Sequence, residues 1–518
     1  MTDNLLDKIY LDDVLAKFSL IGCYHAVTIV LLGTALVGEA FCFYNYVFIA
    51  DNVRYKCADN ASAYDVGQSN FSYGQNTTTA WCNSPMPCSQ WIYEDPNSFV
   101  AEFHLACQEW KRTLVGTAHT VGYMFGITIV GSLSDRFGRR NIAVMTGVMA
   151  AVLGLTKSFV SVYWIYITIE FFEGAIADPY SPLYMLILET ASTHSRANYA
   201  SMSNVGLVIG GLLIALIKWL VPYWRTFTRV IYAPMLLYIF LIYLVDESPR
   251  WLLTKGKMSA VVKNIENAAK LNKLEIKENL SMLSCEKNAS SNFVAVIVET
   301  LKSKSLLKRF FICIIWWNTC TFVDHGLTLN SVLLKGNKYF NYGLVASVRL
   351  PAALIAAIVL NKYKRKRPLV ISFLACTVLC SSQPFMPKNQ LWLGIMIYMA
   401  SKLTSGMFFN ITYIFTSELF PTYSRNSMHA LCACLGRFGN IAATQMPLLV
   451  AYWSGLPIVI YGMMTFVAAL VTTLVPDTAN VSLPDTVRQA EALDELNSRV
   501  LPKRHTSQRT RISSASFN

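Results

Sequence analysis

The chain has 518 residues, of which 54% are hydrophobic and only 14% are charged. A soluble protein of this length usually divides into several domains and carries about 25% charged residues, so the composition excludes an ordinary soluble protein. The net charge of +13 does not indicate a nucleic-acid partner, because the basic residues cluster in short segments between apolar runs, as in the cytoplasmic loops of membrane proteins.

The apolar residues form runs of about twenty, the length that a helix needs to cross a bilayer core of about 30 Å. The first run follows an acidic N-terminal segment and is too long for the apolar region of a signal peptide, so we predict a retained first span. Twelve spans are predicted, at approximately 18–48, 113–133, 141–160, 162–188, 198–220, 224–245, 310–333, 341–361, 368–386, 391–417, 426–449 and 455–475. An even number of spans places both termini on one side, which the basic loops assign to the cytosol.

The spans divide the chain into an all-α membrane protein with two six-helix halves. The expected parts are a cytosolic N-terminus (1–17), an N-terminal bundle (18–245), a cytosolic linker (246–309), a C-terminal bundle (310–476) and a cytosolic tail (477–518). The linker is polar and lysine-rich, which favours amphipathic helices at the membrane surface.

A loop of about sixty residues, 51–112, separates the first two spans and carries more acids than bases, as expected outside the cell. It contains four cysteines (Cys57, Cys82, Cys88 and Cys107) and three glycosylation sequons (at Asn60, Asn70 and Asn76). Together they predict a glycosylated extracellular loop held by disulfides. Four cysteines allow three pairings, and the sequence does not choose among them.

Two further patterns lie at the cytoplasmic ends of the spans. Glu189 and Arg196 follow the fourth span of the first half, and Glu418 and Arg425 follow the fourth span of the second with the same spacing, which favours an internal duplication. Two six-helix halves around a midplane site are typical of a rocking transporter.

A basic turn after the second span carries the acid Asp135 among three cations, and the sixth span ends at an acid and a base around Pro249, which should stop that helix. The groups concerned are Asp135, Arg136, Arg139, Arg140, Glu247 and Arg250. We predict that they form a charge lock at a cytoplasmic gate, together with the repeated Glu–Arg pairs.

These motifs resemble known transporters. Residues 131–140 read GSLSDRFGRR, similar to the signature loop of the major facilitator superfamily, and residues 246–253 read DESPRWLL, similar to an element of its organic cation/anion/carnitine transporter family. Sugar porters share that element. Residues 91–94, 102–107, 417–426, 476–478 and 483–486 also match the organic ion family, in family order. The resemblance implies the major facilitator fold, alternating access and a plasma-membrane location.

Charged residues inside predicted spans are candidates for the substrate site, because such groups are costly in the bilayer. Arg437 lies where the anion and carnitine branches of the family carry arginine, and Arg349 lies where relatives often carry an acid. Two mid-membrane arginines favour a carboxylate, sulfate or phosphate group. Pairing of these arginines with Asp324 or Asp178 is the competing interpretation.

The acids inside the predicted spans are also compatible with organic cations as substrates. The candidates on this side are Glu39, Asp178 and Asp324, with Lys402, His325 and Tyr180 beside them. Glu170 and Glu173 replace the superfamily pattern R-x-x-Q-G in the fourth span, which leaves the coupling mechanism open. A buried carboxylate can carry a proton, whereas a fixed ion pair explains the same residues more simply. For His325 a hydrogen-bonded structural role is favoured.

The sequence contains no catalytic constellation, so we expect no enzyme, no cofactor and no metal site. The favoured function is transport of small organic anions or zwitterions such as carnitine across the lipid bilayer. The sequence does not decide whether transport is coupled to a proton or to a counter-substrate. The alternatives are an organic cation transporter and a transporter-like sensor that no longer moves a substrate.

Overall fold

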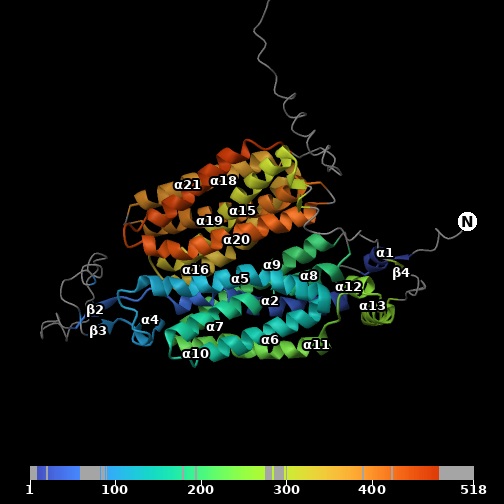
Figure 1. Cartoon of the computed structure of the whole chain (residues 1–518), viewed down its shortest axis with the longest axis horizontal. Helices are drawn as coiled ribbons and strands as arrows, with labels where there is room; N and C mark the ends of the chain where they lie inside the picture. Colours follow the sequence, from blue (N-terminus) through green and yellow to red (C-terminus); the bar gives the residue numbers. More distant parts are fainter. Residues whose placement is uncertain are drawn as a thin grey trace, which may run out of the picture.

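The computed structural model describes residues 9–18, 22–58, 82, 88, 90–177, 180–192, 195–274, 283–284, 297–298, 300–363, 365–387, 390–421 and 424–477. Two groups of long helices lie side by side along a common direction (Figure 1). Short strands and short helices lie at both ends of the bundle.

The first group contains α2 (Cys23–Ile49), α5 (Glu109–Phe137), α6 (Arg139–Lys157), α7 (Tyr163–Ile176), α8 (Tyr180–Thr190), α9 (Arg196–Leu220), α10 (Trp224–Tyr232), η2 (Ala233–Phe240) and α11 (Leu241–Leu244). Helices therefore occupy all six ranges predicted for this half. The fourth range is divided between α7 and α8, and the sixth tightens into the 3₁₀ segment η2 at Pro234, which has no backbone N–H to donate.

The second group contains α15 (Lys304–Asn330), η4 (Ser331–Leu333), α16 (Lys338–Ser347), α17 (Arg349–Lys362), α18 (Lys366–Ser382), η5 (Gln383–Phe385), α19 (Leu391–Glu418), α20 (Arg425–Leu449) and α21 (Leu456–Thr472). The eighth predicted range is interrupted at Val348, between α16 and α17. Pro351 explains the interruption, because it cannot donate a hydrogen bond to the carbonyl of Ser347.

The remaining elements lie at the two ends of the bundle. They are β1 (Ile9–Tyr10), α1 (Leu11–Ala16), β2 (Tyr55–Cys57), β3 (Trp91–Tyr93), α4 (Phe99–Glu102), α12 (Pro249–Thr254), α13 (Met258–Asn272) and β4 (Leu283–Ser284). We call the end with β2 and β3 the loop end, and the end with α1, α12 and α13 the linker end (Figure 1). Pro249, expected to stop the sixth span, begins the short helix α12.

Each group of helices has its own apolar core. One buried cluster is built almost entirely from residues 32–245, and a second from residues 306–475. A third, smaller cluster packs α1 against α12 and α13 at the linker end. The two groups of helices therefore have separate apolar cores.

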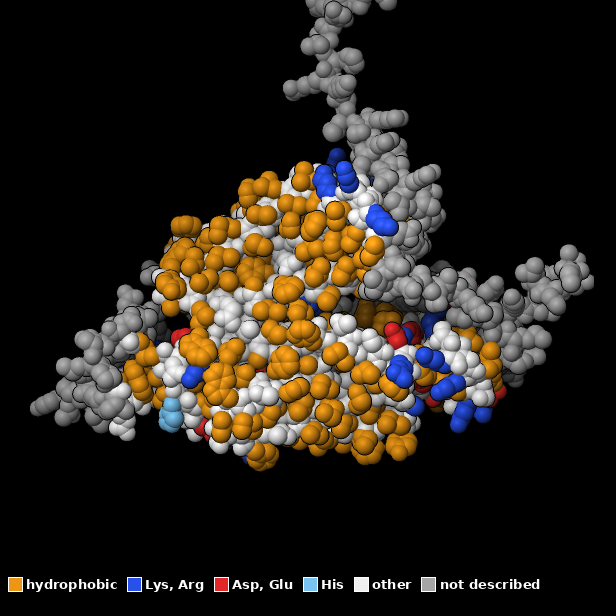
Figure 2. Space-filling view, viewed as in Figure 1, with side chains coloured by type: hydrophobic (Ala, Val, Ile, Leu, Met, Phe, Trp, Pro, Cys, Tyr) orange, Lys and Arg blue, Asp and Glu red, His pale blue; other side chains and the backbone are white. Residues whose placement is uncertain are grey.

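Large apolar side chains also cover the outer flanks of both halves (Figure 2). Leu354, Ile371 and Val378 are each about two-thirds exposed (65%, 65% and 67%). Such a continuous apolar surface is unfavourable in water and favourable in lipid. Among the described residues, seven helices are long and apolar enough to cross a membrane. Lysine and arginine side chains gather at the linker end (Figure 2).

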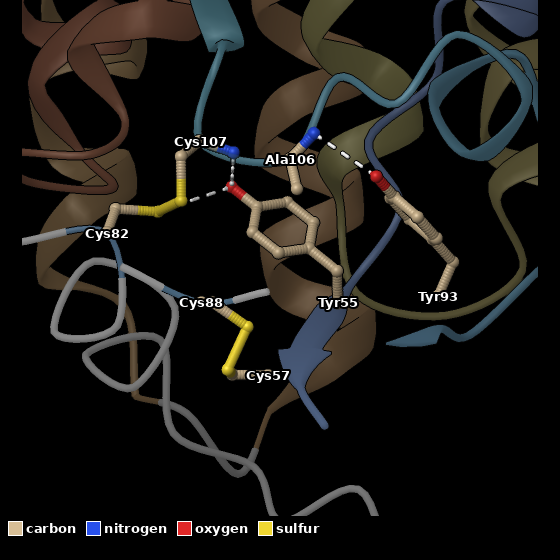
Figure 3. Close-up of a disulfide and its surroundings, with 7 residues drawn as sticks. All are labelled: Tyr55, Cys57, Cys82, Cys88, Tyr93, Ala106 and Cys107. Carbon is tan, nitrogen blue, oxygen red and sulfur yellow. Dashed lines mark hydrogen bonds between the residues drawn. A yellow bond between two sulfur atoms is a disulfide. The ribbon is translucent and has the colours of Figure 1, made fainter. Parts of the chain in front are cut away.

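The loop between α2 and α5 contains two disulfides, Cys57–Cys88 and Cys82–Cys107. Strands β2 and β3 pair antiparallel, and the Tyr55 hydroxyl accepts a hydrogen bond from the Cys107 amide at 3.0 Å (Figure 3). Burial raises the pKa of Tyr55, so this hydroxyl stays protonated. The structure thus selects one of the three pairings. The three sequon asparagines lie outside the described residues.

Replacing both Cys57 and Cys88 by serine is expected to destabilise this loop by about 2–4 kcal/mol, because the disulfide restrains the unfolded chain. The measurement is limited proteolysis of the purified protein with and without a reducing agent. Faster cleavage within the loop is expected for the variant, and for the reduced wild type. Equal cleavage rates in all samples would contradict the prediction.

Candidate functional site

The central candidate residues come from six helices of both halves. Glu39 lies in α2 and Tyr180 begins α8, whereas Asp324 and His325 lie in the last third of α15. Arg349 begins α17, Lys402 lies in α19 and Arg437 lies in α20. Asp178 is outside the described residues. The breaks between α7 and α8 and between α16 and α17 place Tyr180 and Arg349 at helix ends inside the bundle.

The partner of Asp324 is Lys402 and not an arginine. The Lys402 ammonium lies 2.5 Å from the Asp324 carboxylate and also donates to Thr328 at 3.0 Å. The Ser405 hydroxyl donates to the same carboxylate oxygen at 2.9 Å. Because Lys402 and Asp324 neutralise each other, neither brings an unbalanced charge to the site.

The two arginines differ in their surroundings. Arg349 lies within electrostatic reach of Tyr44, Asp324 and Tyr180. The Arg437 guanidinium lies 5.2 Å from the centre of the Tyr123 ring, a cation–π contact. No ion pair joins Arg437 to a carboxylate of the described residues.

Aromatic side chains surround these charges. Tyr180 stacks on Tyr184 with ring centres 5.5 Å apart. Arg349 and Arg437 both interact electrostatically with Tyr180. Glu39 is only 5% exposed and acts electrostatically on Tyr180 and Tyr44. The arrangement brings Glu39, Tyr180 and the two arginines into one central region.

His325 joins the two halves. Its Nε2 atom lies 2.6 Å from the hydroxyl of Tyr46, which belongs to α2 of the other half. The imidazole is 4% exposed and packs edge-on against Phe43. His325 is therefore hydrogen-bonded and buried, and its functional role stays a prediction.

Sequence reasoning missed Lys157 in α6. This lysine is fully buried and pairs with both Glu170, at 2.9 Å, and Glu173, at 2.5 Å. The fixed ion pair suggested for the two glutamates thus exists, and Lys157 is its cation. A lysine near the end of a predicted span is normally interpreted as an interfacial residue. Only the tertiary structure shows that Lys157 faces α7 and pairs with its two glutamates.

Glycines let α5 approach α7 closely enough to complete this cluster. A Cβ atom on Gly122 would lie 2.2 Å from the carbonyl oxygen of Phe171, and one on Gly174 would lie 2.3 Å from that of His119. Any side chain at these positions would force the helices apart. The close approach places His119 Nδ1 3.2 Å from Glu170 Oε1.

The predicted gate residues of the first half gather at the linker end. Arg139 pairs with Asp135 at 2.5 Å and with Glu189 at 3.1 Å. One oxygen of Glu247 accepts hydrogen bonds from the amides of Arg139 and Arg140, at 2.9 and 3.0 Å. These contacts tie the turn between α5 and α6 to the ends of α8 and α11.

The N-terminal segment joins the same lock. Arg250 donates to the carbonyls of Glu189 and Ala191, both at 3.2 Å, and pairs with Asp12 of α1 at 2.5 Å. Arg136 is exposed and lies over the ring of Phe137. Nothing is described for the side chain of Arg196.

The second half contains a simpler version of the lock. Glu418 pairs with Arg365 at 3.2 Å, as Glu189 pairs with Arg139 in the first half. Arg425 begins α20, as Arg196 begins α9. The basic turn between α17 and α18, residues 361–367, contains no acid of its own, yet its Arg365 reaches the repeated glutamate.

The described polar contacts between the halves lie in the middle of the bundle and toward the loop end. Lys338 pairs with Asp51 at 2.5 Å, and Thr117 is hydrogen-bonded to Thr444 at 2.8 Å. At the linker end, each ion pair between described residues stays within one half. The polar contacts between the halves that involve described residues therefore lie toward the loop end.

Comparisons with known proteins agree with this architecture. The model of the sugar (and other) transporter family matches residues 28–488. Solute carrier family 22 member 1 of Bos taurus is 29% identical over 412 residues, which cover 79% of this chain and 73% of the relative. Member 3 of Rattus norvegicus is 26% identical over 413 residues, covering 79% and 75%. These relatives confirm the resemblance to the organic ion transporter family.

Solved structures show the same fold. The inward-open conformation of the xylose transporter XylE from E. coli has a TM-score of 0.60 at 18% identity, covering 90% of this chain and 98% of that chain. Its partially occluded inward-open conformation has a TM-score of 0.58, also at 18% identity, covering 89% and 100%. The chain thus belongs to the sugar (and other) transporter family of the major facilitator superfamily and is a transporter of the solute carrier 22 type.

Proposed function

We propose that this chain carries small organic anions or zwitterions such as carnitine across a plasma membrane by alternating access. In this proposal all twelve helical ranges cross the bilayer, the loop 51–112 is extracellular and both termini are cytosolic. The clustering of basic side chains at the linker end, opposite the disulfide-containing loop, supports that orientation.

The observation that carries the choice of substrate is the environment of Arg437. Lys157 and Lys402 are matched by glutamates or aspartate at 2.5–2.9 Å, whereas Arg437 contacts the face of Tyr123. The charges of Arg349, Lys402, Arg437 and Asp324 sum to +2 in the second half, and Glu39 of α2 lowers the sum for the central region to +1. A carboxylate, sulfate or phosphate group would restore neutrality there and accept paired hydrogen bonds from a guanidinium.

Substrate transport by this site can be tested in oocytes. We would measure uptake of labelled p-aminohippurate, carnitine and tetraethylammonium by the wild type, Arg437→Asp and Arg437→Lys, and correct each uptake for surface expression. Loss of a hydrogen bond to a charged group costs about 1.5–3 kcal/mol, so Arg437→Asp should lose roughly tenfold or more of anion or carnitine uptake. Arg437→Lys should keep part of it, because the positive charge remains.

The other outcomes separate the alternatives. Saturable tetraethylammonium uptake by the wild type would contradict the anionic assignment and favour an organic cation transporter, in which buried Glu39 and half-buried Asp324 would hold the cation. No uptake of any probe at normal surface expression would favour a sensor that does not transport.

A further inference from the structure

The buried cluster on α7 contains two carboxylates and a single lysine. Glu170 and Glu173 lie one helical turn apart on the same face, and both are at most 1% exposed. Lys157, also fully buried, contacts both of them. The Tyr232 hydroxyl donates a hydrogen bond to Glu173, and Lys157 lies 3.3 Å from the side-chain oxygen of Asn45.

The charges of this cluster do not balance if both carboxylates are ionised. Two carboxylates and one ammonium leave one net negative charge, and burying an uncompensated ion costs several kcal/mol. A proton removes that charge at lower cost, and buried acids commonly bind one for this reason. The other described titratable or charged groups facing the cluster are Tyr46 and Cys42 of α2, His119 of α5, Tyr166 of α7, and Tyr232 and Arg225 of α10.

Of these groups, Arg225 is the only permanent cation, and its charge is already balanced. It pairs with Glu102 at 2.5 Å and donates to the carbonyls of Ser158 and Val160. His119 contacts only one of the two carboxylates, Glu170. No second permanent cation among the described residues neutralises the cluster.

A series of side-chain contacts leads from the cluster toward the loop end. A cavity of about 50 Å³ between the halves is lined by Tyr46, Asp51, Arg112 and Thr113, among others. This volume and these polar groups suit water. The ring of Tyr46 packs 5.7 Å from that of His119, which in turn contacts Glu170. The Tyr46–His325 hydrogen bond crosses between the halves at this point, so separating the halves at the loop end would break it and expose His119.

We propose that Glu170 and Glu173 together bind one proton, which they take up from the loop end when the halves separate there. Proton binding converts one carboxylate into a carboxylic acid and changes the cluster charge from −1 to 0. The neutral cluster is less costly to seal from water, so protonation favours closure at the loop end. Closure at that end carries substrate inward, and acidification outside therefore accelerates uptake.

The proton itself can be measured without any substrate. Infrared spectra of the purified protein near pH 7 should contain a carboxylic-acid C=O band from this pair, because surface carboxylates are ionised at that pH. The band should be lost from the double variant Glu170→Gln/Glu173→Gln. Absence of such a band in the wild type, or an unchanged band in the double variant, would overturn the proposed site.

The effect on uptake rests on the proposed transport function and forms a second, separate test. Lowering the external pH from about 7.5 to about 5.5 should raise the uptake rate of the wild type several-fold. Glu173→Gln, whose amide imitates the neutral acid, should lose this pH dependence at equal surface expression. Glu94→Gln, which removes an exposed carboxylate at the loop end, should keep it.

The two tests fail in different ways. Unchanged pH dependence in Glu173→Gln would overturn the role of the proton in uptake. If no probe is transported by the wild type, the proposed function fails, and the infrared measurement still decides whether the pair binds a proton.

Discussion

Replacing Lys157 by methionine is expected to destabilise the protein by about 3–5 kcal/mol, the cost of removing one partner of a buried ion pair. The change leaves Glu170 and Glu173 facing each other with no ammonium between them. Thermal unfolding of the detergent-solubilised protein and its surface expression measure the loss. Both should fall strongly.

Two further variants separate charge from packing in this experiment. Lys157→Met/Glu173→Gln removes one carboxylate as well, so it should recover much of the lost stability. Arg54→Met breaks the exposed pair with Glu94, whose side chains are 46% and 41% exposed, and should cost only about 0–1 kcal/mol. A double variant as unstable as Lys157→Met would show that the loss comes from packing.

Replacing Glu247 by alanine is expected to disable the proposed gate at the linker end. One oxygen of this buried carboxylate accepts hydrogen bonds from the amides of Arg139, Arg140 and Ser248, at 2.9, 3.0 and 3.0 Å. Each hydrogen bond to a charged group contributes about 1.5–3 kcal/mol, so transport should fall by roughly tenfold or more. The measurement is the initial uptake rate at matched surface expression.

The controls for Glu247 test the charge and the position. Glu247→Gln keeps an acceptor oxygen and should lose less activity than the alanine variant. Glu266→Ala removes an exposed acid of α13 at the same end of the molecule and should transport normally. Normal transport by Glu247→Ala would contradict a gating role for this carboxylate.

The lock also explains why glycine is needed in the turn between α5 and α6. Gly138 has a φ of +109°, a conformation that side chains disfavour. A Cβ atom there would lie 2.3 Å from the second oxygen of Glu247. The signature turn therefore combines a backbone shape that glycine allows with a carboxylate that covers the start of α6.

Some features of this protein follow from the sequence alone. Apolar runs long enough to cross a bilayer are local properties, and helices occupy each of the twelve predicted ranges. The motif at 131–140 predicts a charged turn between helices, and its acid and arginine meet one turn apart, as Asp135 and Arg139. Such contacts are readable because both partners belong to the same short segment.

The choice of distant partners depends on the tertiary structure. Three ion pairs join residues that are distant in the sequence: Lys157 with Glu170, Lys402 with Asp324, and Arg365 with Glu418. Each pair forms because of how the helices are rotated and packed against each other. The same holds for the pairing of Cys57 with Cys88. Periodicity shows which face of a helix a residue occupies, but it does not show which helix lies opposite. The packing of glycines and large side chains decides which helices lie opposite each other. It therefore also decides where buried charges are balanced.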